Sequence, residues 1–224
     1  DEVEKIRKAA SIADHAFAQV LPQLRPGITE LEVAIELEFT MRKAGASGVS
    51  FRPIVAAGTR SALPHAEPGR RVFAHGDFVV MDFGCVVDGY CSDMTRTVVV
   101  GEPTEKHLLI YDLVLRAQLE GLKAVRPGVT AKSVDSVARG IIEEGGYGQY
   151  FGHNLGHGVG LEIHERPRLS PKDETVLEPG MVVTVEPGIY LPDFGGVRIE
   201  DLVLVTEDGC SVISSTFKEL YVVE

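Results

Sequence analysis

Asp82 stands in the middle of an apolar stretch, after Phe-Val-Val-Met and before Phe-Gly. An ionised carboxylate in a buried strand costs free energy unless a hydrogen-bonded partner or a cation neutralises it. Such a carboxylate is usually a surface residue or half of a salt bridge, and Arg96 or Arg198 could supply the other half. The alternative is a bound cation, which requires further ligands.

Three further acids occur at matching positions when the chain is compared with itself. The matching segments are GDFVVMD (76–82) with GMVVTVE (180–186), and GYCSD (89–93) with GVRIE (196–200). Asp82 thus aligns with Glu186, and Asp93 aligns with Glu200. The two acids of each half would lie close to opposite one another on adjacent strands, about 4.5–5.5 Å apart. Four converging carboxylates raise one another's pKa, and two divalent cations would balance their formal charge.

A glycine-rich segment, GHNLGHGVGLEIHERP (152–167), adds His153, His157 and His164. Because glycine has no Cβ, such a segment can approach a ligand closely. One imidazole joined to four carboxylates makes a nitrogen and oxygen site, which suits Mn²⁺, Fe²⁺, Co²⁺ or Zn²⁺ without choosing among them. The segment lacks the strand-to-helix context of a dinucleotide fingerprint.

Other histidines and the cysteines have plainer interpretations. A lone histidine is more often structural than a ligand, and we interpret His15, His75 and His107 in that way. The three cysteines read as small buried hydrophobes, with a thiolate ligand at Cys85 as the alternative. Three cysteines are too few for a disulfide framework, which predicts a reducing, cytoplasmic compartment.

The acids belong to a longer repeat. Residues 24–45 resemble residues 125–146, and the His-x-x-Pro at His65 matches the one at His164. Each half therefore contains two helices, a histidine and a strand pair with two acids, in the same order. The repeat predicts two related halves that close on each other, with the site at their junction, where pockets commonly occur.

Local patterns predict the elements that must position these residues. Helical periodicity and the Thr29–Glu32 capping box predict helices at about 2–20, 29–43, 104–125 and 130–145. β-type runs occur at about 77–86, 90–100, 180–187, 196–206 and 219–223. Asp88-Gly89 is a strong hairpin turn signal between the first two runs.

Composition narrows the classes of function. The chain has 224 residues, of which 44% are hydrophobic and 25% charged, with a formal net charge of −11. This acidic balance disfavours nucleic acid and an anionic membrane surface as partners, and no apolar stretch approaches the ~20 residues of a membrane span. No basic-then-apolar leader is visible, so we expect no signal peptide. We interpret the missing initial Met as a sign of a processed chain or an excised domain.

Together these segments resemble the pita-bread metallopeptidases, a family that includes methionine aminopeptidase, aminopeptidase P and prolidase. The resemblance rests on MDFG…SDMTRT, GHNLGHGVG…HERP, VEPGIY and GGVRIED, in family order over essentially the whole chain. It implies an α+β pita-bread fold, with two pseudo-symmetric halves and antiparallel sheet covered by helices. It also implies a single metallopeptidase catalytic domain over 1–224, with the internal repeat at about 1–100 and 101–224.

The resemblance further implies the metal site. The ligands that it implies are Asp82, Asp93, His157, Glu186 and Glu200. They would hold two divalent ions, with manganese preferred and cobalt, zinc or iron as alternatives. Tyr190 and Arg198 resemble partners that hold Asp82, a role that commonly tunes metal affinity.

The same resemblance implies a mechanism in which a metal-bridged hydroxide attacks the scissile carbonyl. Glu186 would carry the proton of the water to the leaving nitrogen, and His164 would hydrogen-bond the tetrahedral intermediate. His65 would assist proton transfer or orient the peptide, and His153 would line the prolyl side.

Within the family, SALPHAEPG (61–69), EPGIY and GVRIED resemble the Xaa-Pro peptidase branch of prolidase and aminopeptidase P. This branch implies hydrolysis between an N-terminal residue and proline, in dipeptides or longer peptides. Its implied partners are a peptide with proline at the second position and, as a candidate, a second copy of the chain. The separate N-terminal domain usual in the branch is predicted to be absent.

Three alternatives stand beside this prediction. One is a methionine aminopeptidase-like activity, which peptides of the Met-Ala type would separate from Ala-Pro peptides. The others are a non-catalytic peptide-binding module of the same fold and a metal-free, creatinase-like amidine hydrolase. The complete set of five metal-ligand residues argues against the last two.

Overall fold

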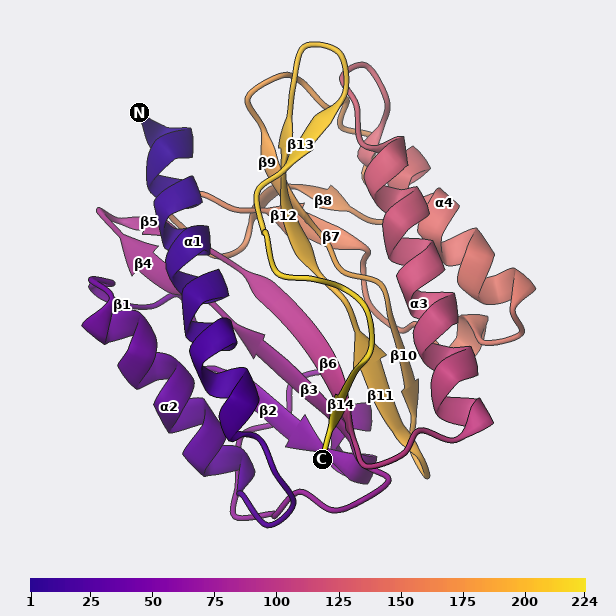
Figure 1. Ribbon diagram of the computed structural model, residues 1–224. Helices are drawn as coiled ribbons and strands as arrows, with labels where there is room; N and C mark the ends of the chain where they lie inside the picture. Colours follow the sequence, from indigo (N-terminus) through magenta and orange to yellow (C-terminus); the bar gives the residue numbers. More distant parts are fainter.

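The computed structural model describes all 224 residues and contains four α-helices (Figure 1). The helices are α1 (Glu2–Val20), α2 (Glu30–Lys43), α3 (Glu105–Ala124) and α4 (Ala131–Glu144). All four were expected from the sequence at these positions. None of them combines the length and the apolar character that crossing a bilayer would need.

Local chemistry explains where these helices begin. The Thr29 side chain accepts a hydrogen bond from the Glu32 amide, and the Glu32 carboxylate accepts one from the Thr29 amide, which completes the expected capping box. Thr104 and His107 form the corresponding pair at α3. The Thr130 hydroxyl accepts from the Ser133 amide at α4. The His107 ring thus has the structural role that we expected.

Short strands connect and underlie the helices. In the first half they are β1 (Gly48–Val49), β2 (Ile54–Ala57), β3 (Phe78–Phe83), β4 (Cys85–Val87), β5 (Tyr90–Cys91) and β6 (Met94–Val100). Those that follow are β7 (Gly156–Gly158), β8 (Glu165–Leu169), β9 (Val182–Val185), β10 (Gly188–Leu191), β11 (Gly195–Arg198), β12 (Asp201–Val205), β13 (Cys210–Val212) and β14 (Tyr221–Val223). Three 3-10 turns complete the chain: η1 (Leu21–Gln23), η2 (Gly58–Ala62) and η3 (Gly148–Tyr150).

Two larger sheets carry most of these strands, in the orders β14-β6-β3-β2 and β13-β12-β9-β7-β8. Neighbours pair antiparallel, except that β14 runs parallel to β6. The smaller sheets are β1-β4-β5 and the hairpin β10-β11. The β4–β5 hairpin turns at Asp88 and Gly89, which both have positive φ, as the Asp-Gly signal predicts.

Three predicted strands are interrupted where the site lies. The run at 90–100 breaks at Ser92 and Asp93, between β5 and β6. The run at 77–86 breaks at Gly84, where only glycine fits, because a Cβ there would lie 1.9 Å from the Ser92 carbonyl oxygen. The run at 196–206 breaks at Ile199 and Glu200, between β11 and β12. At Gly84 the chain leaves a larger sheet for the small sheet β1-β4-β5, and at Glu200 it leaves the β10-β11 hairpin for a larger sheet.

The helices cover the sheets in pairs. Helices α1 and α2 lie against strands of the first half, and α3 and α4 lie against strands of the second, each pair over its own apolar core (Figure 1). The C-terminal segment, yellow in Figure 1, runs between the two pairs and ends as β14 beside β6. The halves also meet directly, since the Thr97 hydroxyl bonds both the carbonyl and the amide of Arg198.

Candidate metal centre

The four aligned acids converge at the junction of the two halves. Asp82 lies in β3, and Asp93 lies one residue before β6. Because Asp82 pairs with Thr95 across the ladder, Asp93 lies diagonal to it rather than directly opposite, which corrects the hairpin geometry that we expected. Glu186 follows β9 and Glu200 precedes β12, one position beyond the paired residues Val185 and Asp201.

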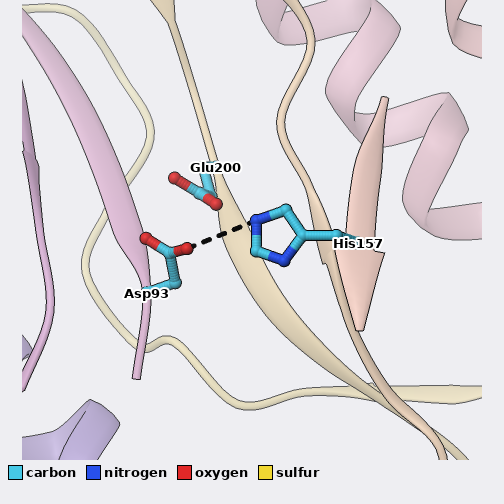
Figure 2. A group of neighbouring side chains, drawn as sticks. All are labelled: Asp93, His157 and Glu200. Carbon is cyan, nitrogen blue, oxygen red and sulfur yellow. Dashed lines mark ion pairs between the residues drawn. The ribbon is translucent and has the colours of Figure 1, made fainter. Parts of the chain in front are cut away.

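His157 in β7 completes the cluster. Its Nε2 lies 3.5 Å from Asp93 Oδ2 and 3.3 Å from Glu186 Oε1. Figure 2 shows the His157 ring and the Asp93 and Glu200 carboxylates turned toward one another from three different segments of the chain. One ligand atom from each of these three residues lies within 4.8 Å of the other two. This spacing is compatible with a single ion bound to all three.

The His157 ring presents a lone pair to this cluster. Its Nδ1 lies 3.0 Å from the Gly158 carbonyl oxygen, which can only accept, so Nδ1 carries the hydrogen. Burial lowers the pKa of His157 to about 4, which keeps the ring neutral and leaves Nε2 without a hydrogen. A protonated carboxyl can donate to this lone pair, but two ionised carboxylates would repel it unless a cation lay between them. A histidine that donates its other N–H to a carbonyl is the usual arrangement for a metal ligand.

The carboxylates are also poorly satisfied by protein groups. Burial raises the pKa of Asp93 and of Glu200 well above their ordinary values, and charge repulsion among the acids raises them further. Burial likewise raises the pKa of Glu186, to about 8. Asp82 Oδ1 and Glu200 Oε1 are buried and have no hydrogen-bond partner. Unpaired buried acceptors of this kind are costly, and divalent cations would satisfy them.

Arg198 is the ion-pair partner of Asp82. Its Nη2 lies 2.6 Å from Asp82 Oδ2, whereas Arg96 pairs instead with Asp201. One guanidinium balances only one of the four acids when all four are ionised. Arg198 also donates from Nη1 to the Tyr190 hydroxyl at 2.7 Å. Tyr190 therefore reaches Asp82 through Arg198 and does not contact it directly.

Two threonines that the sequence analysis did not single out orient the acids. The Thr95 hydroxyl donates to Glu200 Oε2 at 2.6 Å, across the boundary between the two halves. The Thr184 hydroxyl donates to Glu186 Oε1 at 3.0 Å and accepts from the His157 amide. Thr184 lies two residues before an acid in an alternating strand, so its side chain shares that face, which is the signal that could have identified it.

The acids lie in a cavity of about 480 Å³, within the range of about 300–1,000 Å³ typical of small-molecule sites. His65, His153 and His164 line it. The His164 ring lies 4.4 Å from the His157 ring between centroids. Arg168 also lines this wall, a residue that the sequence analysis did not identify.

His153 is fixed by two hydrogen bonds. Its Nδ1 lies 2.8 Å from the Asn154 carbonyl oxygen, so Nδ1 carries the hydrogen. Burial lowers its pKa to about 3, and Nε2 accepts from the Tyr190 hydroxyl at 2.8 Å. Cys85 is not placed to be a thiolate ligand of a metal, because its thiol donates a hydrogen bond to the Ala9 carbonyl in the apolar core.

The donor set fits divalent cations: four carboxylates and one neutral imidazole, with two orphaned buried oxygens among them.

Comparison with known proteins shows which family and which enzymes the chain resembles. The chain matches metallopeptidase family M24 over residues 4–207. It is 52% identical over 220 residues to a Xaa-Pro dipeptidase of Pyrococcus furiosus, covering 98% of this chain and 63% of that one. It superposes on a Xaa-Pro dipeptidase from Bacillus anthracis with a TM-score of 0.97 at 54% identity, over 99% of this chain and 62% of that one.

An X-Pro aminopeptidase from Thermotoga maritima superposes with the same TM-score of 0.97 at 48% identity, over 99% of this chain and 63% of that one. These superpositions confirm the α+β pita-bread fold that the sequence predicts. The chain spans less than two thirds of the length of each of these relatives.

Proposed function

Because the chain belongs to metallopeptidase family M24, we propose that it is a dinuclear metallopeptidase that cleaves between an N-terminal residue and a following proline. The observation that carries this proposal is the convergence of four carboxylates and one imidazole lone pair in a cavity of about 480 Å³. The named relatives, which are Xaa-Pro dipeptidases and an X-Pro aminopeptidase, support the choice of substrate.

We assign the metal ligands as the five residues that converge there. They are Asp82, Asp93, His157, Glu186 and Glu200. Four oxygen-donor residues and one nitrogen donor suit Mn²⁺, Co²⁺, Zn²⁺ or Fe²⁺ alike, and the choice of Mn²⁺ rests on the family resemblance. When bound, two such ions would acidify a water molecule and polarise the scissile carbonyl.

Side chains of the cavity would transfer the proton and hold the substrate. Glu186 would accept a proton from the attacking water and pass it to the leaving nitrogen, and Thr184 holds one of its oxygens in place. His164 is exposed on the cavity wall beside His157 and would donate a hydrogen bond to the oxygen of the scissile carbonyl. His65, exposed on the same cavity, would orient the peptide.

Two wall residues would select the substrate. His153 presents a neutral ring, held by Tyr190, as a flat surface for the prolyl side. Arg168 is exposed on the cavity wall and makes no ion pair. A free C-terminal carboxylate would pair with it, which supports dipeptides over longer peptides.

The cytoplasmic compartment remains a proposal, and the thiols support it. All three cysteines are free, and Cys85 and Cys91 are buried. Unpaired thiols of this kind support a reducing, cytoplasmic environment.

Metal reconstitution with three peptides tests the proposed function. The protein is stripped with a chelator, reloaded with Mn²⁺, Co²⁺ or Zn²⁺, and assayed on Ala-Pro, Ala-Pro-Ala and Met-Ala-Ser. We expect metal-dependent cleavage of Ala-Pro, weaker cleavage of Ala-Pro-Ala and none of Met-Ala-Ser. Uptake of two ions with preferential cleavage of Met-Ala-Ser would replace the proposal by methionine aminopeptidase activity. No metal uptake would contradict the proposal and favour a peptide-binding module.

A further inference from the structure

We propose that Asp135 and Arg139 are positioning residues, which hold the main chain around His153 so that its ring faces Tyr190 in a single orientation. This inference rests on the proposed function, because His153 lines the proposed substrate cavity. Neither Asp135 nor Arg139 lines that cavity. Both belong to α4, on the far side of the segment that carries His153.

The two side chains form a buried, bidentate ion pair one helical turn apart. Arg139 Nε lies 2.7 Å from Asp135 Oδ2, and Arg139 Nη2 lies 2.8 Å from Asp135 Oδ1. The Asp135 side chain is 1% exposed and that of Arg139 19%. A pair at this depth costs desolvation that its own attraction barely offsets. The contribution of this ion pair therefore comes from the further hydrogen bonds that it makes to other groups.

Those groups are main-chain atoms of one short irregular segment, residues 151–155. Arg139 donates to the carbonyl of Phe151 at 3.0 Å and to the carbonyl of His153 at 2.8 Å. Asp135 accepts from the amide of Leu155 at 3.0 Å. The segment has no helix or strand of its own to fix these groups, so the ion pair supplies the scaffold that regular structure would provide elsewhere.

Contacts between aromatic side chains connect this ion pair to the His153 ring. The Arg139 guanidinium lies 4.3 Å from the centre of the Phe151 ring, and that ring packs edge-on against His153 with centroids 5.1 Å apart. His153 Nε2 then accepts from Tyr190, whose oxygen accepts from Arg198, the partner of Asp82. A continuous set of contacts thus joins α4 to a proposed metal ligand.

Arginine is needed for this geometry, because its planar fork serves the carboxylate and two carbonyls at once. A lysine keeps the charge but carries all its donors on one nitrogen, which cannot replace contacts that Arg139 makes from three separate nitrogens. Arg139→Lys should therefore preserve the ion pair and loosen the His153 segment.

The first readout is spectroscopic and needs neither metal nor activity. Long-range ¹H–¹⁵N spectra of the metal-free protein report which ring nitrogen of each histidine carries the hydrogen. We expect His153 in the unmodified protein to be the neutral Nδ1–H form, and Arg139→Lys to show a mixture of forms. Asp135→Asn, which removes the charge and keeps the shape, should give the same mixture and serves if the lysine variant folds poorly.

The second readout is a double-mutant cycle in kcat/KM for Ala-Pro. Arg139→Lys should lose about tenfold in the unmodified protein, as expected for a partner that orients an active-site side chain. In a His153→Ala background the same change should cost less than twofold, because a positioning residue has nothing left to position.

Two control variants exclude a purely structural effect. Arg42→Lys tests a matched arginine, since Arg42 also pairs with an acid four residues earlier, Glu38, and donates to a loop carbonyl. Ile142→Val removes a buried methyl from α4 itself. Both should leave the His153 spectrum unchanged.

An unchanged His153 spectrum in Arg139→Lys, or an equal loss in both backgrounds of the cycle, would overturn the inference. If the unmodified protein cleaves no Xaa-Pro peptide, the proposed function fails. The spectrum then still decides the role of Arg139.

Discussion

Raising the pH from about 6.5 to about 8 should destabilise the metal-free protein, because of the acids at the centre. Burial raises the pKa of Glu186 in the folded chain from 4.5 to about 8. Between these values the folded protein keeps a proton that the unfolded chain has lost. Stability falls with pH wherever the folded state binds more protons. Burial also lowers the pKa of four histidines, His107, His153, His157 and His164, which act with the opposite sign and contribute progressively less as the pH rises above their unfolded value of about 6.5.

The size of the effect follows from the retained proton. One proton corresponds to about 1.4 kcal/mol of stability per pH unit, or about 2 kcal/mol across this interval. For a domain of this length, 1 kcal/mol shifts the melting temperature by about 2–4 °C. We therefore expect a fall of about 4–8 °C from Glu186 alone. Asp93 and Glu200, whose pKa values burial and mutual repulsion also raise, would steepen it.

Scanning calorimetry in excess chelator across this pH range tests the reasoning. Glu186→Gln should reduce the slope by about one proton, whereas Glu144→Gln, at an exposed position of α4, should leave it unchanged. Saturating Mn²⁺ should abolish or reverse the slope, because metal binding displaces the protons. A melting temperature that stays level or rises in the chelated protein would show that these acids are not held protonated by the fold.

Three substitutions extend the test to individual contacts. Asp82→Asn keeps the hydrogen bond to Arg198 but removes a charge, so it should lower the metal content below two ions and reduce turnover at least about 100-fold. An unchanged metal count by mass spectrometry would contradict the ligand assignment. Thr95→Val removes the donor to Glu200, so titration should show metal affinity about 10–100-fold weaker; equal affinity would mean that the hydroxyl does not orient the ligand. Arg168→Met should raise KM for Ala-Pro about tenfold or more and leave KM for the amidated peptide unchanged; equal effects on both peptides would remove the carboxylate role.

Local sequence determined the helices and the turns. Thr29 and Glu32 cap α2 through bonds that span only three residues. The Asp88-Gly89 turn likewise needs only its own backbone conformation. Such features depend on neighbouring residues, so periodicity and capping patterns predict them well.

The acids of the site were predictable for a different reason. Each half repeats the same order of elements, so the repeat alone paired Asp82 with Glu186 and Asp93 with Glu200. An acid within an apolar strand is a strong signal, because its burial demands a partner. The geometry was predicted less well, since the break at Gly84 and the register of β3 with β6 place Asp93 diagonal to Asp82.

Only the tertiary structure decided which groups hold these acids. Arg96 and Arg198 are alike in sequence terms, yet Arg198 pairs with Asp82 and Arg96 with Asp201. Thr95 reaches Glu200 across 105 residues, and no local pattern encodes that distance. Strands as short as β7, which is only three residues long, carry too little periodicity to be recognised. The sequence thus determined which side chains must find a cation, and the packing of the two halves decided how each is held, because the holding contacts join residues more than 100 positions apart in the chain.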